Sequence, residues 1–173
     1  MRQRPLQATV IGPSDANPAI LASAEAIGAH LAARGVTVLT GGGGGVMEAA
    51  SRGAVLAGGL TVGILPGAHH ERANRWCKVV IPTGMGDARN ALTAMAGDMV
   101  IVLGGAAGTL SEICHAWLHQ RPILALTTHG GWAERLAGEP LDHRQRPPVQ
   151  RYDTLELLLT GIDRCSVGLE RAL

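Results

Sequence analysis

A glycine-rich turn followed by a helix start is the segment best suited to chemistry. The apolar run 100–103 is typical of a strand buried on both faces of a parallel sheet, and Gly104–Gly108 follows it directly. Thr109 then opens an expected helix whose first free N–H groups point back at the carboxyl edge of the sheet. The segment therefore predicts an anion site that fits a phosphate. Its candidate contacts are Gly105, Ala106, Gly108 and Thr109.

An upstream loop repeats this arrangement with five consecutive glycines. The strand expected at 36–39 is followed by Thr40, by Gly41–Gly45 and by a helix-forming segment at 46–57. Five glycines cost conformational entropy, so such a run is kept where side chains would collide with a ligand or with neighbouring backbone. A merely flexible connection is the alternative, although flexible loops usually carry polar residues too. The candidate ligand contacts here are Gly41, Gly42, Gly43, Gly44 and Gly45, with Gly12 and Ser14 from the turn after the first strand.

Arg89 and Glu112 are the charged side chains that we assign to the same site. A fixed guanidinium suits phosphate better than lysine does, which favours a ligand role for Arg89 over a surface pairing with Asp87 or Glu112. Glu112 stands one turn into the helix that follows Gly108. It either contacts a ribose or pterin hydroxyl beside the phosphate or simply complements the helix macrodipole.

His115 and His119 stand four residues apart on the same expected helix, a spacing that can hold a metal ion. The sequence offers no evident third ligand, and Glu112 would be diverted from the phosphate site. We therefore expect no metal site and leave the role of the two histidines open.

Composition narrows the class of protein. The chain has 173 residues, 46% of them hydrophobic, which suffices for one core and predicts a single domain over 1–173 with its core at about 8–160. A net charge of +1 and the absence of a basic patch argue against nucleic acid and anionic membranes as partners. The lack of Phe and the single Tyr disfavour stacking on nucleic-acid bases. Three cysteines without CxxC spacing, no membrane-spanning apolar stretch and no signal-peptide core predict a cytoplasmic protein.

Strands and helices are expected to alternate along the chain. The expected strands are 8–11, 36–39, 60–65, 78–81, 99–103 and 122–126, and the expected helices are 17–34, 46–57, 87–96, 110–120 and a short closing one at 155–159. This alternation predicts an α/β fold, a doubly wound and mainly parallel Rossmann-like sheet in three layers, with ligands at the carboxyl ends of its strands. We expect a surface loop at 138–150 and a loose segment in the last ten residues.

Two blocks of the sequence resemble a known family. Arg89, Asp98 and the run from Gly104 to Glu112 are similar to the "lysine decarboxylase-like" or LONELY GUY (LOG) proteins, whose signature is Met-x-x-Arg-Lys followed by PGGxGTxxE. The block 40–67 is similar to that family's upstream GGGxxGxM block. The resemblance covers residues 8–128. It implies that in enzymatic relatives the arginine and the glutamate carry N-glycosidic cleavage, where an anion stabilises a sugar with oxocarbenium character.

Three departures from that signature indicate a branch. Gly104 stands where the signature has Pro, Ala106 where it has the second Gly of the pair, and Asn90 where it has Lys. These variants are more similar to the DprA-related branch of small Rossmann-type proteins that includes molybdenum cofactor carrier proteins. That resemblance implies a phosphorylated ligand, often without catalysis, and a homodimer or homotetramer. Asn90 joins the candidate ligand contacts.

The leading expectation is a binding or carrier protein for a phosphorylated small molecule, either a nucleotide or a molybdenum cofactor (molybdopterin-type) ligand, with no required cofactor. The alternative is a nucleoside 5′-monophosphate phosphoribohydrolase that releases a free base and ribose 5-phosphate, with Arg89 and Glu112 as its catalytic residues. A DNA-processing module related to DprA is disfavoured by the near-neutral charge. The sequence leaves open which base or pterin is bound.

Overall fold

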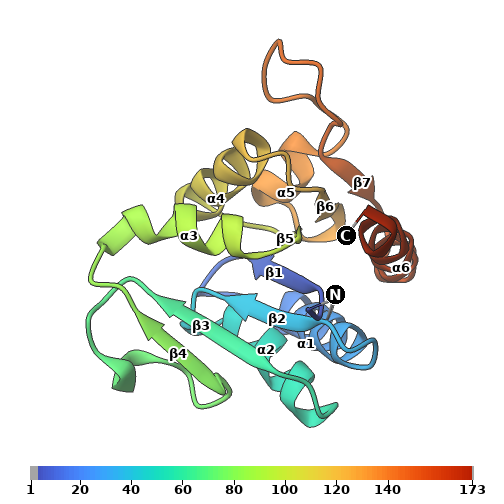
Figure 1. Cartoon of the computed structure of the whole chain (residues 1–173). Helices are drawn as coiled ribbons and strands as arrows, with labels where there is room; N and C mark the ends of the chain where they lie inside the picture. Colours follow the sequence, from blue (N-terminus) through green and yellow to red (C-terminus); the bar gives the residue numbers. More distant parts are fainter. Residues whose placement is uncertain (1–3, 173) are drawn as a thin grey trace.

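Seven parallel strands form one sheet in the order β4-β3-β2-β1-β5-β6-β7 (Figure 1). The computed structural model describes residues 4–172. The strands are β1 (Gln7–Ile11), β2 (Thr37–Thr40), β3 (Thr61–Leu65), β4 (Val79–Pro82), β5 (Met99–Leu103), β6 (Ile123–Leu126) and β7 (Gln150–Tyr152). Every neighbouring pair is parallel.

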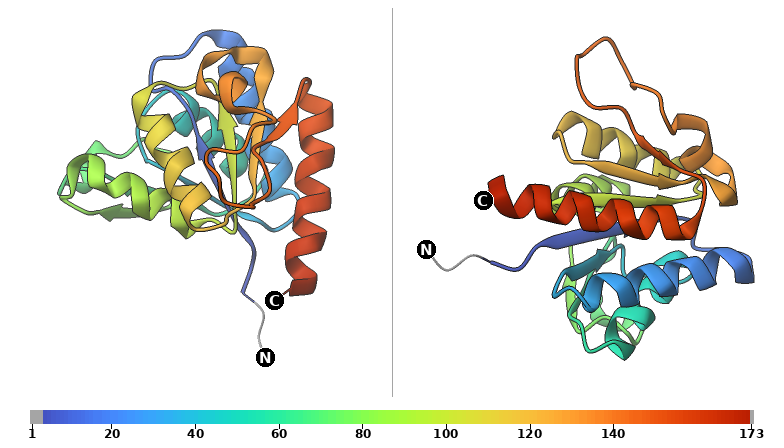
Figure 2. Two further views of the ribbon diagram at one scale, coloured as in Figure 1. Left: turned by 90° about the horizontal axis from the view of Figure 1, so that it is seen from above. Right: turned by 90° about the vertical axis from the view of Figure 1, so that its right-hand side faces the viewer.

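Helices cover both faces of this sheet, which confirms the expected three-layer, doubly wound α/β fold (Figures 1 and 2). One face carries α1 (Pro18–Ala32), α2 (Val46–Leu56) and α6 (Leu155–Ala172), and the other carries α3 (Arg89–Ala96), α4 (Ala107–Leu118) and α5 (Gly131–Leu136). Within residues 4–172, no helix is long and apolar enough to cross a membrane.

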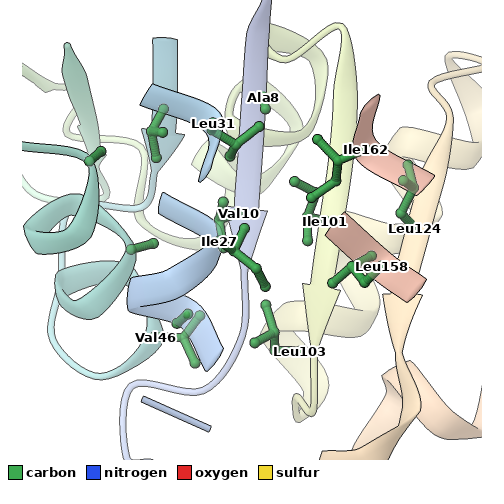
Figure 3. Packing of buried hydrophobic residues seen from close by; sticks show 14 of the residues in the cluster. Ala8, Val10, Ile27, Leu31, Val46, Ile101, Leu103, Leu124, Leu158 and Ile162 are labelled. Carbon is green, nitrogen blue, oxygen red and sulfur yellow. The ribbon is translucent and has the colours of Figure 1, made fainter. Parts of the chain in front are cut away.

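The central strand β5 shows how the apolar run is used. Ile101 and Leu103 face the layer of α1, α2 and α6 (Figure 3), whereas Val100 and Val102 face the opposite layer. All four side chains are completely buried. A strand covered on both sides needs an uninterrupted apolar sequence rather than an alternating one.

The direction of winding reverses between β1 and β5. From β1 the chain proceeds through β2, β3 and β4 to one edge, and from β5 it proceeds to the other. The carboxyl ends of β1 and β5 are adjacent, since Ile11 pairs with Val102. In open α/β sheets this switch point is where a crevice for ligands forms. Gly12 is required there, because a Cβ on it would lie 2.7 Å from the Leu103 carbonyl oxygen.

The C-terminal part differs from the sequence-based expectation. The closing helix is α6, which has 18 residues instead of the expected short element at 155–159, and the last ten residues are helical up to Ala172 rather than loose. Leu158 and Ile162 are fully buried in the core, and Leu169 packs against it. Tertiary packing of this apolar face therefore carries the helix through Gly161 and Gly168, which have low intrinsic helix propensity.

Two short elements were absent from the expectation. The helix α5 buries Ala133, and the strand β7 pairs Gln150 with Leu124 at the edge of the sheet. The expected loop at 138–150 is irregular up to Val149, with β7 beginning at its last residue. Elements of six and three residues carry too little periodicity to be recognised in a sequence.

Candidate functional site

A cleft of about 400 Å³ opens at the switch point, along the carboxyl edge of the sheet. It is formed by the turn after β1 and by the starts of α2, α3 and α4. Its lining residues are Gly12, Pro13, Ser14, Asp15, Met47, Asp87, Arg89, Asn90, Ala106, Gly108, Thr109 and Glu112. The fold thus brings together eight of the residues singled out in the sequence, namely Gly12, Ser14, Arg89, Asn90, Ala106, Gly108, Thr109 and Glu112.

The loop after β5 aims a helix start at this cleft. Helix α4 begins at Ala107, ahead of the expected start at Thr109, so Gly108 and Thr109 lie in its first turn. Gly104 and Gly105 have φ values of +55° and +104°, a region that favours glycine. Their carbonyl oxygens accept hydrogen bonds from the N–H groups of α5, at 2.9 Å for Gly104 and 3.3 Å for Gly105. These hydrogen bonds to α5 fix the loop in place. The free N–H groups at the start of α4 are then available to an anion.

Arg89 and Glu112 face each other inside the cleft. Nη1 of Arg89 lies 3.4 Å from Oε1 of Glu112, and the two side chains are only 12% and 10% exposed. The same Nη1 donates to Oγ1 of Thr93 at 3.0 Å. The Nε atom of Arg89 is buried and has no hydrogen-bond partner among the described residues. A guanidinium with an unused buried donor lacks the acceptor that such a group ordinarily requires.

Burial governs the ionisation of this pair. Loss of solvation raises the pKa of the Glu112 carboxyl to about 7, although the positive charge of Arg89 pulls that pKa down. Loss of solvation also lowers the pKa of Arg89, against the opposing effect of the Glu112 and Asp87 charges. Near neutral pH the Glu112 carboxyl is therefore poised between its charged and neutral forms, a condition that suits proton transfer.

The raised pKa of Glu112 predicts how stability depends on pH. The carboxyl titrates near its ordinary value of about 4.3 in the unfolded chain and near 7 in the fold. The neutral Glu112 carboxyl contributes fully to the free energy of unfolding below about pH 4.3, and this contribution is lost as the pH rises through about 7. The loss is at most roughly 1.4 kcal/mol for each unit by which folding raises the pKa. Glu112→Gln keeps a neutral side chain, so its free energy of unfolding should not show this loss. Urea unfolding between pH 4 and 8 measures it.

The exposed Glu156→Gln is the control for this series, because it removes a carboxyl that the α6 surface leaves in solvent. It should keep the pH dependence of the unchanged protein. Parallel stability curves for the unchanged protein and Glu112→Gln would contradict the raised pKa.

The first glycine of the upstream run makes room for Arg89. A Cβ on Gly41 would lie 2.5 Å from Nη1 of Arg89 and 2.8 Å from the Met47 sulfur. Gly41 lies outside the cleft lining but determines where the guanidinium rests. Thr93, one helical turn after Arg89, accepts a hydrogen bond from the same guanidinium.

Gly42 and Gly45, two further glycines of the run, have positive φ values and lie close to neighbouring groups. Gly42 (φ +75°) lies against Leu65, and Gly45 (φ +63°) packs on the carbonyl oxygens of Pro13 and Ser14. Asn74 Nδ2 donates to the carbonyl of Gly43 at 2.8 Å. The cleft lining, within the part of the chain that the structure describes, includes none of Gly41–Gly45 and not Gly105. Neighbouring backbone and side chains therefore explain Gly41, Gly42 and Gly45 but not Gly44, and a direct ligand contact by these six glycines stays a prediction.

We predict that Gly41→Ala weakens ligand binding without unfolding the protein. The added methyl group displaces the Arg89 guanidinium, and the loss of one charge-assisted hydrogen bond corresponds to about 1.5 kcal/mol, or roughly tenfold in Kd. Calorimetric titration with AMP measures the change. Gly168→Ala is the control, since Gly168 lies in α6, is not a candidate ligand contact, and has no atom within 4 Å of an added Cβ. Equal affinities for the two variants would contradict the positioning role of Gly41.

Sequence reasoning missed several residues of the site. Asp15 and Asp87 line the cleft, and together with Glu112 they place three carboxyl groups around Arg89, the one basic residue in the lining as described. Met47 also lines it, at a position inside the block 40–67 that had already been singled out. Asn74 lies in a polar segment whose pattern carried no signal. His115 and His119 are not among the described lining residues.

Within residues 4–172, no group of three or more His, Cys, Asp or Glu side chains is arranged to hold a metal ion. The three cysteines are free thiols, and none of them lines the cleft as described.

The fold and the cleft together define a class of protein. It is a Rossmann-like protein with a cleft at the switch point of its sheet, and the start of a helix, an arginine and a glutamate line that cleft. Comparison with known proteins identifies the family. The model of the SLOG cluster4 family matches residues 5–156, and the chain belongs to this family.

Individual relatives agree with this assignment. The cytokinin riboside 5′-monophosphate phosphoribohydrolase of Mycobacterium marinum is 29% identical over 167 residues, which cover 88% of both chains. The structure of the molybdenum cofactor binding protein from Rippkaea orientalis is 31% identical, with a TM-score of 0.78 over 93% of this chain and 97% of that one. The molybdenum cofactor carrier protein from Chlamydomonas reinhardtii is 26% identical, with a TM-score of 0.78 over 95% and 99%. The expected resemblance to LOG proteins and molybdenum cofactor carriers is confirmed.

Proposed function

We propose that the cleft binds a phosphorylated small molecule, a nucleotide or a molybdenum cofactor type of ligand, and that the protein acts as its carrier or binding protein. One observation supports this most strongly: the buried guanidinium of Arg89 has an unused donor and shares the cleft with the first turn of α4. A phosphate oxygen can accept from both, and the two together attract a negative charge. The names of the molybdenum cofactor proteins above favour the same class of ligand.

The charges in the cleft favour a single phosphate over a polyphosphate. Arg89 is accompanied by Asp15, Asp87 and Glu112, so additional phosphates would meet carboxylates without further cations to offset them. The carboxylates instead suit hydroxyl or amino donors on the rest of the ligand. Titration with AMP, ADP and ATP tests this, with AMP expected to bind most tightly.

A second candidate function is nucleoside 5′-monophosphate phosphoribohydrolase. The observation that favours it is the Glu112 carboxyl, held within 3.4 Å of Arg89 and with its pKa raised to about 7 by burial. Such a group can donate a proton to a departing base or, when ionised, stabilise positive charge on the sugar. The mycobacterial relative named above carries this activity in its name. Asn90 stands where the LOG signature has lysine, so the site has one cation fewer.

Incubation with AMP separates the two functions, because a phosphoribohydrolase releases adenine and ribose 5-phosphate whereas a carrier returns AMP unchanged. If adenine appears, Glu112→Gln should lower turnover far more than affinity, since a neutral amide can hydrogen-bond ribose but cannot offset developing positive charge. If adenine does not appear, AMP is not a substrate, and the mass of a co-purifying ligand identifies the natural ligand.

We also propose that the protein is a homodimer or homotetramer. Ile81 and Leu92 are 45% and 38% exposed and line an apolar groove with Ile64, Met95 and Ala96. This groove lies where α3 leaves β3 and β4 uncovered, and a second copy would remove it from water. Light scattering at micromolar concentration should give at least twice the chain mass of 17.9 kDa. Leu92→Arg should reduce the assembly, and a monomer mass for the unchanged protein would contradict it.

A further inference from the structure

A second pocket lies at the opposite end of α4 from the cleft. It has a volume of about 110 Å³, well above the roughly 10–15 Å³ that a water molecule requires. The end of α4, the start of β6 and the loop before β7 enclose it. Its lining residues are Trp117, Gln120, Arg121, Pro122, Ile123, Arg146, Pro147, Pro148 and Gln150. None of these residues lines the cleft.

The pocket holds two guanidinium groups and no carboxylate among its described lining residues. Arg121 uses Nη2 on the Met95 carbonyl at 3.0 Å, and Arg146 uses Nη1 on the carbonyls of Trp117 and Leu118, the latter at 2.9 Å. These contacts attach both arginines to the backbone, so the positive charge stays at the pocket.

The pocket wall contains two buried donors, one of which has a carboxylate nearby. The Nε atom of Arg121 and the indole Nε1 of Trp117 are buried and have no hydrogen-bond partner among the described residues. Trp117 itself is only 4% exposed. The Asp142 carboxylate accepts from the backbone N–H and the guanidinium of Arg144, each at 2.9 Å, and it also lies near the Trp117 indole N–H, which helps to lower the pKa of Asp142. The Nε atom of Arg121 is therefore the buried donor that still calls for an acceptor.

The rest of the wall is apolar. Pro122, Ile123, Pro147 and Pro148, with the ring of Trp117, surround the two arginines. An inorganic anion would leave these surfaces without a partner, whereas an organic anion would bury them. The two kinds of wall therefore fit the two halves of a small amphiphilic anion.

We propose that this pocket binds a small organic carboxylate, with its carboxylate on Arg121 and Arg146 and its apolar body against Trp117 and the prolines. Arginine pairs well with carboxylates because its N–H groups match the two oxygens. The pocket is separated from the cleft by the 12 residues of α4, or roughly 18 Å at 1.5 Å per residue. It is thus a site of its own and does not rest on the function proposed for the cleft.

Benzoate is a suitable probe, with neutral benzamide and inorganic phosphate as comparisons. In the full chain, millimolar benzoate should shift the NMR resonance of the Trp117 indole N–H, identified by its loss in Trp117→Phe. Benzamide and phosphate should shift it at least tenfold less at equal concentration. Saturating AMP should leave the benzoate affinity unchanged, because AMP is directed to the cleft.

Arg146→Gln and Arg121→Gln should each weaken benzoate binding at least tenfold. Arg72→Gln is the matched control, since Arg72 is exposed and lies beside β4, at the far edge of the sheet from β6 and β7. Lack of a benzoate-induced shift, equal effects of benzamide or phosphate, or displacement of benzoate by AMP would each overturn the proposal. The benzoate-induced shift of the Trp117 resonance is measured on the unchanged protein, so it tests the proposal even if an arginine variant fails to fold.

Discussion

Gly108→Val should abolish the binding of AMP and of other phosphorylated ligands while leaving the protein as stable as before. Gly108 lies in the first turn of α4 and lines the cleft, and a Cβ placed on it meets no atom within 4 Å. The valine side chain would therefore stand in open space in front of the free N–H groups, where the phosphate is proposed to lie. Valine has a higher helix propensity than glycine, so the helix itself is not weakened.

Calorimetric titration with AMP and thermal unfolding together test this prediction. Gly168→Val is a matched control, because Gly168 lies in α6, is exposed, and also has nothing within 4 Å of an added Cβ. It should bind AMP as the unchanged protein does. If Gly108→Val also retains that affinity, the anion site lies elsewhere.

Arg89→Ala should weaken every phosphorylated ligand by about 1.5–3 kcal/mol, or roughly 10- to 150-fold in Kd. The variant removes the one basic side chain among the described cleft residues and leaves Glu112 buried without its cation. Because the Arg89 charge lowers the pKa of Glu112, its removal should raise that pKa further and keep the carboxyl neutral. General loss of fold is distinguished by unfolding measured on the same sample.

Comparison of AMP with adenosine separates a phosphate contact from any other effect of this variant. The loss should be large for AMP and small for adenosine, which lacks the phosphate. Arg89→Lys should fall in between, since a lysine keeps the charge but not the forked donors. Equal losses of affinity for AMP and adenosine in Arg89→Ala would show that Arg89 maintains the structure of the cleft and does not contact the phosphate.

Much of the fold could be predicted from the sequence because its elements are marked by strong local signals. The apolar run of β5 is typical of a strand buried on both faces of a parallel sheet, and the glycines at Gly104–Gly108 marked the turn that follows. Parallel topology then places successive loops at one edge. Arg89 and Glu112 accordingly meet at this edge, 3.4 Å apart, while their roles toward a ligand stay predictions.

The sequence could not predict features that depend on tertiary contacts. Helix α6 is extended by core packing of Leu158 and Ile162, which propensity does not measure. The structural role of Gly41 depends on the position of the Arg89 side chain, which belongs to α3 and is distant in the sequence. The raised pKa of Glu112 results from burial by several segments, and no local pattern reports it.

Calorimetric titration of the unchanged protein with AMP and with adenosine tests most directly whether this cleft recognises a phosphate. The buried donors of Arg89 and the start of α4 predict that AMP binds at least tenfold more tightly than adenosine, and that the difference disappears in Gly108→Val. Equal affinities for AMP and adenosine, or a difference that survives in Gly108→Val, would contradict the proposed phosphate site.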